Sequence, residues 1–305
     1  PNGDGEVPPP ASSSRMRRQL VTPRLVNSSA SSVDVATLAS FATDFGRWRF
    51  RKPAAVARCR SSAEVAEAIR FCRKRGVPVV ARSQGHTQSG QSTTRGLLLD
   101  TSAMNRILEI NEKELYADVE AGVIWRDLVL ATTKKGLLPP VLTNNLGVTV
   151  SGTTSMAGLG VASFRHGTQA DNAIELEVVT GAGEVVVCSR EKESELFDMV
   201  RCSLGQIAMI TRVRTRLRRV PPMVRMYTLV YDDLGRFMAD AELVMDGTTF
   251  ATMGGICSPA PLGFRKIGDG LELGKGMIGF AQWLYPMFLT VEFAPGAEPD
   301  DDQVL

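Results

Sequence analysis

The 305-residue sequence is poor in several residues on which common functional sites depend. It has only two histidines and five cysteines, and no two cysteines form a C-x-x-C pair. Such scattered cysteines argue against a disulfide framework and against a structural zinc site. We therefore expect reduced thiols, a cytoplasmic protein and no metal site. Because imidazole is scarce, any chemistry that needs it must use His86 or His166.

Long apolar runs and a strong net charge are also absent. No stretch approaches the ~18 uninterrupted apolar residues that a membrane span requires. The formal net charge is only +2, so charge gives no case for nucleic-acid binding. With 44% hydrophobic and 22% charged residues, the composition is that of a folded globular chain. We expect small-molecule partners, with neither nucleic acid nor a membrane.

The ends of the chain differ in composition from its middle. The sequence opens with a segment rich in Pro, Ser and Arg, and we predict a flexible N-terminal tail over residues 1–44. The pair Pro221-Pro222 interrupts a long strand pattern and marks a domain boundary. The predicted organisation is one domain at 45–222 and the beginning of a second at 223–305.

The middle of the chain mixes β-α-β patterns with hairpins. Ala54 to Cys59 is predicted to be a strand, and Ser61 with Glu64 forms a capping box that begins a helix. Gly181-Ala182-Gly183 signals a hairpin between two further strands. The segment from Leu142 to Gly167 is rich in Thr, Ser, Asn and Gly, and no regular structure is predicted for it. This mixture favours an α+β fold over a doubly wound parallel sheet.

The strongest candidate for a functional site is the polar loop around His86. A predicted strand ends at Arg82 and leads into a run of small polar residues that contains Gly85. Glycine allows a ligand to approach the backbone closely, and successive loop amides can hold a pyrophosphate. A neutral imidazole is a competent nucleophile or base near pH 7. The alternative is a surface loop with an incidental histidine.

Three other features each allow two interpretations. The small residues from Thr149 to Gly160 suit the packing of backbone against a flat ligand, or an irregular core loop. They follow no clear strand, which argues against a Rossmann motif. His166 has no second histidine or cysteine nearby in the sequence, so a structural role is favoured over catalysis. Alternating arginines from Arg212 to Arg218 suit phosphate binding, but a solvated strand face is favoured.

Five short blocks stand in an order and spacing shared with one enzyme family. They are Gly85-His86-Thr87 with Gly90-Gln91, Thr149-Val150-Ser151-Gly152-Thr153, Phe164-Arg165-His166-Gly167, Leu176-Glu177-Val178-Val179-Thr180-Gly181, and Leu204-Gly205-Gln206 with Ile210-Thr211-Arg212. Together they resemble the cytokinin dehydrogenases, which are covalent-FAD oxidases with a PCMH-type FAD-binding domain. The resemblance covers about residues 45–245.

The resemblance implies an α+β, two-subdomain PCMH-type FAD-binding domain followed by an incomplete α+β substrate domain. It implies FAD bound covalently through His86. Some covalent oxidases add a cysteinyl link, but no Cys lies between Cys72 and Cys188, so a single bond is expected. The other cofactor-binding positions that it implies are Ala81, Ser83, Gln84, Gly85, Thr87, Gln91, Asn144, Thr149, Ser155, Leu159 and Ile210.

The implied reaction is hydride transfer from an amine-type C–H bond of a small-molecule substrate to FAD, with oxygen or a quinone as electron acceptor. In the family, an Asp that follows a Thr accepts the proton of the substrate amine. Here Thr143 is followed by Asn144, the candidate catalytic residue, although an amide cannot act as a carboxylate base. The alternatives are an alcohol, sugar or secondary-metabolite oxidase of the same flavin fold, or a catalytically impaired flavin-binding protein.

Overall fold

The computed structural model describes residues 31–32, 35–259, 264–267, 270–273 and 283–304. The chain divides into two compact units. Unit 1 comprises residues 1–158 and 168–218, and unit 2 comprises residues 159–167 and 219–305. Unit 2 therefore begins near the predicted domain boundary, but it also includes a short segment from the middle of the sequence.

The first sheet of unit 1 is small and has helices on both faces. Its strands run in the order β1-β2-β4-β3, and β2, β4 and β3 are parallel. Leu38 packs with Val56 and Leu98 on one face, whereas Ala57 and Leu99 face the opposite side. The elements are β1 (Ser31–Ser32), α2 (Val35–Ser40), β2 (Ala55–Arg58), α3 (Ser62–Arg73), β3 (Val79–Arg82) and β4 (Leu97–Asp100).

Helix α3 forms where the capping box predicted it. The Ser61 hydroxyl accepts a hydrogen bond from the backbone N–H of Glu64 at 3.3 Å. The Glu64 carboxylate reaches the N–H of Arg60 at 2.9 Å, one residue before the position that a capping box predicts. Val65 and Cys72 are fully buried on the face that packs against the first sheet.

The second sheet of unit 1 is antiparallel, with the strand order β5-β6-β10-β8-β9. Trp125 and Phe197 are buried in its core, while Val179 and Met209 join the cluster around α3, so the two sheets share packing. The elements are β5 (Ile107–Asn111), β6 (Tyr116–Glu120), α4 (Trp125–Thr133), β7 (Leu137–Leu138), α5 (Val150–Thr154), β8 (Ala173–Thr180), β9 (Val185–Ser189), α7 (Ser194–Val200), β10 (Ala208–Arg216) and β11 (Arg218–Arg219).

The predicted tail over residues 1–44 is too long. Residues 1–30 and 33–34 lie outside the described residues, but β1 pairs with β2 and α2 follows it. Leu38 is fully buried against the first sheet, and Asp44 is buried at 4% exposure. The Pro, Ser and Arg bias that suggested a tail belongs to the beginning of this stretch, and Leu38 after it is buried from helix α2.

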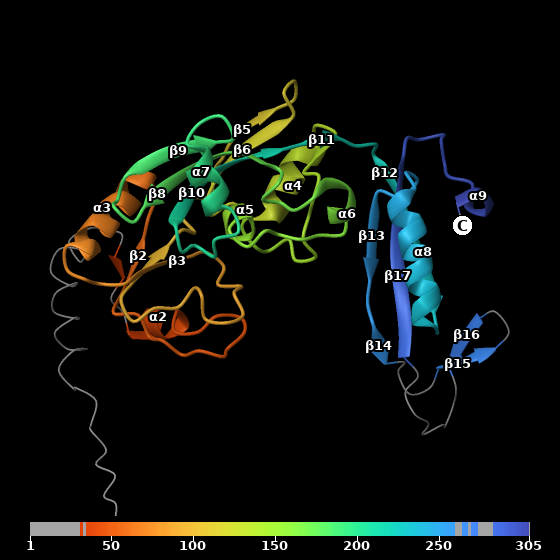
Figure 1. Cartoon of the computed structure of the whole chain (residues 1–305), viewed down its shortest axis with the longest axis horizontal. Helices are drawn as coiled ribbons and strands as arrows, with labels where there is room; N and C mark the ends of the chain where they lie inside the picture. The colour runs from red at the N-terminus through yellow and green to blue at the C-terminus, as the bar shows by residue number, and fades with distance from the viewer. Residues whose placement is uncertain (1–30, 33–34, 260–263, 268–269, 274–282, 305) are drawn as a thin grey trace, which may run out of the picture. The chain divides into compact units, whose positions relative to one another are not determined.

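Unit 2 is an antiparallel sheet covered on one face by a helix. Figure 1 shows α8 lying along the long strand β17. Its core contains Tyr227, Val244, Met287 and Leu289. The elements are α6 (Ser163–His166), β12 (Met223–Tyr231), α8 (Leu234–Asp246), β13 (Thr252–Gly255), β14 (Ser258–Pro259), β15 (Phe264–Ile267), β16 (Gly270–Leu273), β17 (Trp283–Phe293) and α9 (Asp301–Val304).

Arg165 joins the mid-chain segment of unit 2 to the end of α8. Its Nε donates to the carbonyl oxygen of Phe250 at 2.8 Å, and its Nη2 donates to those of Gly247 and Val244 at 2.5 and 3.3 Å. Because the last carbonyls of a helix lack partners within the helix, a guanidinium there satisfies them and complements the helix dipole. The sequence block around His166 thus has a structural function in unit 2.

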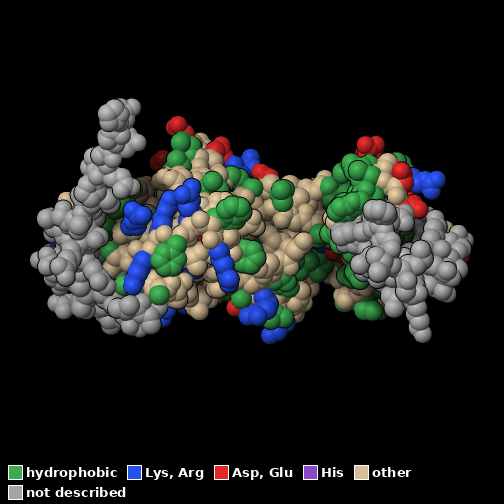
Figure 2. All heavy atoms as spheres, turned by 90° about the horizontal axis from the view of Figure 1, so that it is seen from below, with side chains coloured by type: hydrophobic (Ala, Val, Ile, Leu, Met, Phe, Trp, Pro, Cys, Tyr) green, Lys and Arg blue, Asp and Glu red, His purple; other side chains and the backbone are tan. Residues whose placement is uncertain are grey.

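The surface combines basic and apolar side chains. Figure 2 shows Lys and Arg side chains interspersed with hydrophobic ones on one face, with acidic side chains mainly along the rim. Exposed aromatic residues include Phe45, Trp48 and Phe50. In the part of the chain that the structure describes, no helix is long and apolar enough to cross a membrane.

Candidate functional site

A cavity of about 680 Å³ lies within unit 1 and opens beside the predicted histidine loop. Ligand pockets typically measure about 300–1,000 Å³, so this one can hold a cofactor-sized molecule. Its lining joins the ends of β3 and the loop after it to α5 and to the beginning of β10. The lining includes apolar residues, Val79, Leu99, Val179, Met209 and Ile210, together with the residues of the polar loop.

The polar loop presents backbone donors to the cavity. Gly85 has a φ of +65°, and a Cβ at this position would lie 2.4 Å from the Arg82 guanidinium, so glycine is needed both for conformation and for space. Within the described residues, the backbone N–H groups of residues 84–88 donate to no protein group. Such a run of available amides is suited to an anionic ligand.

The segment before β2 holds this loop in place. The buried Asp44 carboxylate accepts hydrogen bonds from the Thr87 hydroxyl and the Gly90 N–H, both at 2.7 Å. The backbone N–H of Phe45 donates to the Gly85 carbonyl at 3.0 Å. Gly46 allows the close approach, because a Cβ there would lie 1.8 Å from the carbonyl oxygen of Gln88. The loop is therefore pinned on both sides of His86.

Arg82 adds a second link between the same segments. Its guanidinium donates to the carbonyl oxygens of Thr43 at 2.7 Å and Phe41 at 3.4 Å. Burial lowers the pKa of Arg82 from its ordinary value, whereas the nearby Asp44 and Asp100 carboxylates act in the opposite direction. Arginine remains charged after such a shift, so Arg82 contributes positive charge to the cavity wall.

The imidazole of His86 has contacts on one ring face and at one ring nitrogen. Phe45 stacks on the face, with 4.3 Å between ring centroids and 26° between planes. Nδ2 of Asn145 lies 3.1 Å from Nε2 of His86. Both Asn145 and His86 line the cavity.

A tight turn presents Asn145 to the histidine. The Thr143 hydroxyl donates to the backbone carbonyl of Asn145 at 2.9 Å, and the backbone N–H of Gly147 donates to the Asn145 side-chain oxygen at 2.9 Å. On the neighbouring side, the hydroxyls of Ser83 and Thr149 lie 2.8 Å apart and connect the loop to the first turn of α5. Side chains far apart in the sequence thus surround one end of the cavity.

The structure brings most of the predicted site residues together. The cavity is lined by His86, Ala81, Ser83, Gln84, Gly85, Thr87, Gln91, Thr149, Ser155 and Ile210. Asn144 is exposed and is not among the lining residues, whereas the adjacent Asn145 is. Leu159 is 71% exposed and belongs to unit 2. Of the small residues predicted to pack against a flat ligand, Thr149, Ser151, Gly152, Thr153 and Ser155 contribute to the lining.

Asp44, Phe45 and Asn145 were not among the predicted site residues. Asp44 fell within the predicted tail, and Phe45 lies next to it. For these two positions the sequence offers only a weak signal, an acidic and an aromatic residue before an apolar strand. Asn145 is of the same residue type as Asn144, which was the predicted site residue. Only the geometry of the turn shows which of the two side chains faces His86.

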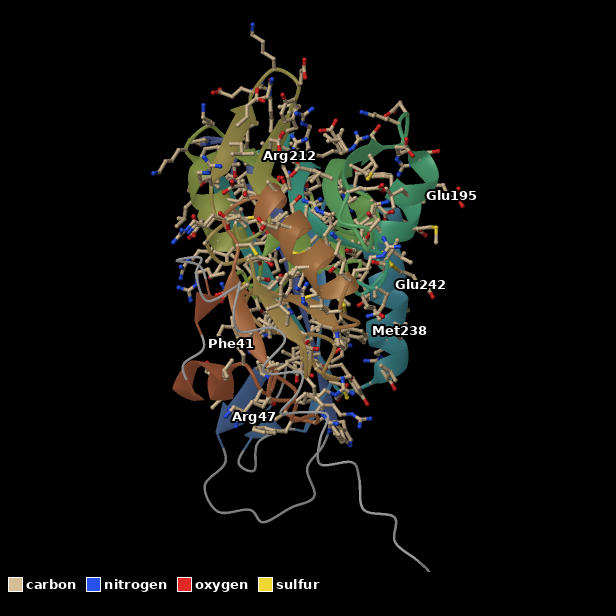
Figure 3. All side chains as sticks on the ribbon, turned by 90° about the vertical axis from the view of Figure 1, so that its left-hand side faces the viewer. Phe41, Arg47, Glu195, Arg212, Met238 and Glu242 are labelled. Atoms are coloured by element: carbon tan, nitrogen blue, oxygen red, sulfur yellow. The ribbon has the colours of Figure 1, made fainter. Side chains whose placement is uncertain are left out.

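The arginines of β10 form an ion-pair network. Asp118 has a side chain only 6% exposed and accepts from Arg212 at 2.6 Å and Arg214 at 2.9 Å. Arg212 also pairs with Glu175 at 2.9 Å. Figure 3 shows Arg212 among other side chains of unit 1, whereas Glu195 projects outward from α7. Because Arg212 and Arg214 are paired with carboxylates, they form neither a free phosphate-binding site nor a merely solvated strand face. Both interpretations made from the sequence are wrong for these two residues.

The buried cysteines are not poised for chemistry. Burial is the main cause that raises the pKa of Cys59 to about 12 and those of Cys72 and Cys188 to about 11. Thiols with such pKa values carry almost no thiolate at neutral pH. Among the described residues, no three His, Cys, Asp or Glu side chains are grouped so that they could hold a metal ion.

Comparison with known proteins relates the cavity to flavin binding. Residues 53–189 match the family described as FAD binding domain. An uncharacterised oxidoreductase, ORF5 in the fasciation locus of Rhodococcoides fascians, is 36% identical over 273 residues, which are 89% of this chain and 58% of that protein. Cytokinin dehydrogenase 7 of Oryza sativa subsp. japonica is 40% identical over 220 residues, which are 70% of this chain and 42% of that protein. The chain spans about half the length of these curated relatives.

A solved structure shows a similar fold. That of 6-hydroxy-D-nicotine oxidase from Arthrobacter nicotinovorans superposes with a TM-score of 0.68 at 23% identity, covering 85% of this chain and 54% of the other. With the matched FAD-binding domain, it confirms the predicted α+β FAD-binding fold. The family resemblance drawn from the five sequence blocks is confirmed as well. The chain therefore contains an FAD binding domain over residues 53–189 and is similar to the cytokinin dehydrogenases over about 70% of its length.

Proposed function

We propose that the protein is an FAD-dependent oxidoreductase that holds FAD covalently through His86 and accepts hydride from a polarised C–H bond of a small substrate. The observation that carries this proposal is the placement of His86 at a cavity that also presents free loop amides and an apolar wall. The similarity to cytokinin dehydrogenases supports an amine substrate of the cytokinin class. Oxygen or a quinone would remove the electrons.

The chemistry of the lining fits FAD. A pyrophosphate needs donors and positive charge, and the cavity has the amides of residues 84–88 together with Arg73 and Arg82. Among its described lining residues there is no Asp or Glu to repel an anion. The flat ring of a flavin needs apolar contact, which Val179 and Ile210 supply. When bound, FAD supplies a two-electron acceptor, which no protein side chain provides.

Residues of the chain would position the cofactor and keep water out of the cavity. The bonds to Asp44 hold the loop at the cavity, so little reorganisation of the loop is needed when an anion binds. The bonded hydroxyls of Ser83 and Thr149 hold the loop against α5. The apolar side chains of the lining would reduce the access of water to a bound flavin.

The lack of a carboxylate in the described lining favours a second candidate within the same fold. Thr143 and Asn145 line the cavity, but an amide cannot remove a proton from a substrate amine. Two kinds of protein would not need an Asp to accept the proton of a substrate amine. One is an alcohol, sugar or secondary-metabolite oxidase, and the other is a flavin-binding protein with impaired catalysis. Reduction of the flavin in the absence of oxygen distinguishes these candidates. A cytokinin such as N6-isopentenyladenine should reduce the flavin of an amine oxidoreductase, and polyols should reduce that of an alcohol or sugar oxidase. Neither should reduce the flavin of a protein with impaired catalysis.

Acid precipitation tests the cofactor site. The purified chain and His86→Ala are precipitated with acid, and flavin absorbance is measured in pellet and supernatant. Flavin in the wild-type pellet and its loss from the His86→Ala pellet are expected. Release from both would refute the covalent link but keep a bound cofactor. No flavin in either preparation after incubation with FAD would refute the oxidoreductase proposal.

A further inference from the structure

We infer that residues 45–52 form a docking surface for a membrane of anionic lipids. This 45–52 segment lies between α2 and β2, and its sequence FGRWRFRK interleaves four basic residues with three aromatic ones. The whole chain has a formal net charge of +2, so the segment alone exceeds it and the rest of the chain sums to −2. The surface belongs to unit 1, and the inference does not rest on the proposed flavin chemistry.

The aromatic side chains of the 45–52 segment lie in solvent. Trp48 is 82% exposed, Phe50 is 72% exposed and Phe45 is 60% exposed. Phe45 uses one ring face to stack on His86, whereas Trp48 and Phe50 contact no other ring within the described part of the chain. A single exposed apolar residue is ordinary in a folded protein. Three exposed aromatic residues within six positions form the kind of patch that marks an interaction site.

The basic side chains of the same segment lack carboxylate partners. All four are exposed, and among the described residues none of them forms an ion pair: Arg47, Arg49, Arg51 and Lys52. No Asp or Glu follows in the sequence until Glu64. The preceding Asp44 is buried, and its carboxylate is bonded to the histidine loop. The positive charge of the segment is therefore available to an external anion.

Contacts with the rest of unit 1 hold the segment in place. The backbone N–H of Arg51 donates to the carbonyl oxygen of Ala42 at 2.7 Å and closes the loop. The stem of Arg49 lies over Gly90, where an added Cβ would come within 2.7 Å of it. The exposed aromatic side chains stand on either side of this anchored arginine. A surface fixed in this way loses little conformational freedom when it binds.

An anionic membrane surface matches both the aromatic and the basic residues. Tryptophan is enriched where headgroups meet acyl chains, and each basic side chain near anionic lipids strengthens binding about fivefold. Single-stranded nucleic acids and peptides are bound in grooves or at sheet edges, but the segment lines no part of the cavity and belongs to no strand. From the lack of a long apolar run we expected no membrane partner, yet a peripheral contact needs no such run.

Sedimentation with lipid vesicles tests the surface. The full chain is mixed with vesicles of phosphatidylcholine alone, or of an equimolar mixture of phosphatidylcholine and phosphatidylserine. We expect binding to the mixed vesicles that weakens as salt is added. Trp48→Ala combined with Phe50→Ala should weaken binding about tenfold, because two apolar side chains no longer enter the interface. Arg47→Gln combined with Arg51→Gln should weaken it about 25-fold, because two charges are lost.

Two control variants remove the same kinds of side chain elsewhere. Trp283→Ala removes an exposed tryptophan of unit 2, and Lys113→Gln combined with Lys134→Gln removes two exposed charges of unit 1. Both controls should bind as the wild type does. No binding to the mixed vesicles, equal binding to both kinds of vesicle, or an equal loss in the controls would overturn the inference. Tighter binding to polyglutamate or to a single-stranded oligonucleotide would also overturn it, because the surface would then serve an acidic polymer.

Discussion

Replacing Arg165 by Ala is expected to loosen unit 2 without changing the cavity of unit 1. The guanidinium donates to three carbonyl oxygens at and beyond the end of α8, at 2.5–3.3 Å. A bond from a charged donor contributes about 1.5 kcal/mol at the low end of its range, and the half-buried position of Arg165 justifies that low end. Counting the two shorter bonds, we expect a loss of about 2–3 kcal/mol.

Hydrogen exchange measured by mass spectrometry reports this loss by region. Because about 1.4 kcal/mol corresponds to a factor of ten, exchange in the last turn of α8 and in residues 161–167 should accelerate about 30- to 160-fold. Arg165→Lys should give much of the same effect, since an ammonium cannot reach carbonyls in different directions as a guanidinium does. Arg236→Ala, at an exposed position of α8, is the matched control.

Equal exchange in Arg165→Ala and Arg236→Ala would refute the reasoning. It would mean that water satisfies the helix end as well as the guanidinium does. A change confined to the peptides of unit 1 would also contradict it, because the carbonyl partners of Arg165 all belong to unit 2.

Three further predictions concern unit 1. Asp44→Ala removes both carboxylate bonds of the histidine loop, so exchange at residues 89–92, whose bonded amides include that of Gly90, should accelerate at least about tenfold; unchanged exchange would show that the loop does not need this anchor. Asp118→Ala removes the carboxylate partner of Arg214 and leaves Arg212 with Glu175 alone, so it should cost about 3 kcal/mol in urea unfolding; an unchanged midpoint would contradict a structural network. Burial raises the pKa of Cys59 from 9.0 to about 12, so the thiol loses its proton more readily in the unfolded protein, and stability should fall as the pH rises from about 9 towards 12. Cys59→Ala should flatten that part of the curve of stability against pH. An equal fall in the wild type and in Cys59→Ala would show that this thiol is not the cause.

Local signals explain why much of the fold could be predicted. The helix after Ser61 was placed correctly because its cap and its apolar spacing lie within one short stretch. The hairpin at Gly181-Ala182-Gly183 joins β8 and β9 as predicted. The order of five short blocks indicated a flavin domain, which the matched FAD binding domain bears out, and the loop at His86 lines the cavity of unit 1.

The rest depended on contacts that no local pattern encodes. Helix α5 was missed because Thr, Ser and Gly have low helix propensity, and tertiary bonds support it instead. The indole N–H of Trp125 donates to Thr153 at 2.9 Å, and the Ser151 hydroxyl donates to Ala121 at 2.7 Å. Phe45 reaches His86 only because the chain before β2 folds back along the loop.

The mid-chain segment of unit 2 has a practical consequence for anyone who shortens this protein. A cut near residue 219 looks natural in the sequence, yet it would separate residues 159–167 from their partners. The N-terminal piece would keep Arg165 without its three carbonyls, and the C-terminal piece would lose the Val161 carbonyl that accepts from Met253 at 2.8 Å. During synthesis, the segment must likewise wait for about eighty further residues before its partners emerge. The two units are therefore interleaved in the sequence, and no single cut separates one from the other.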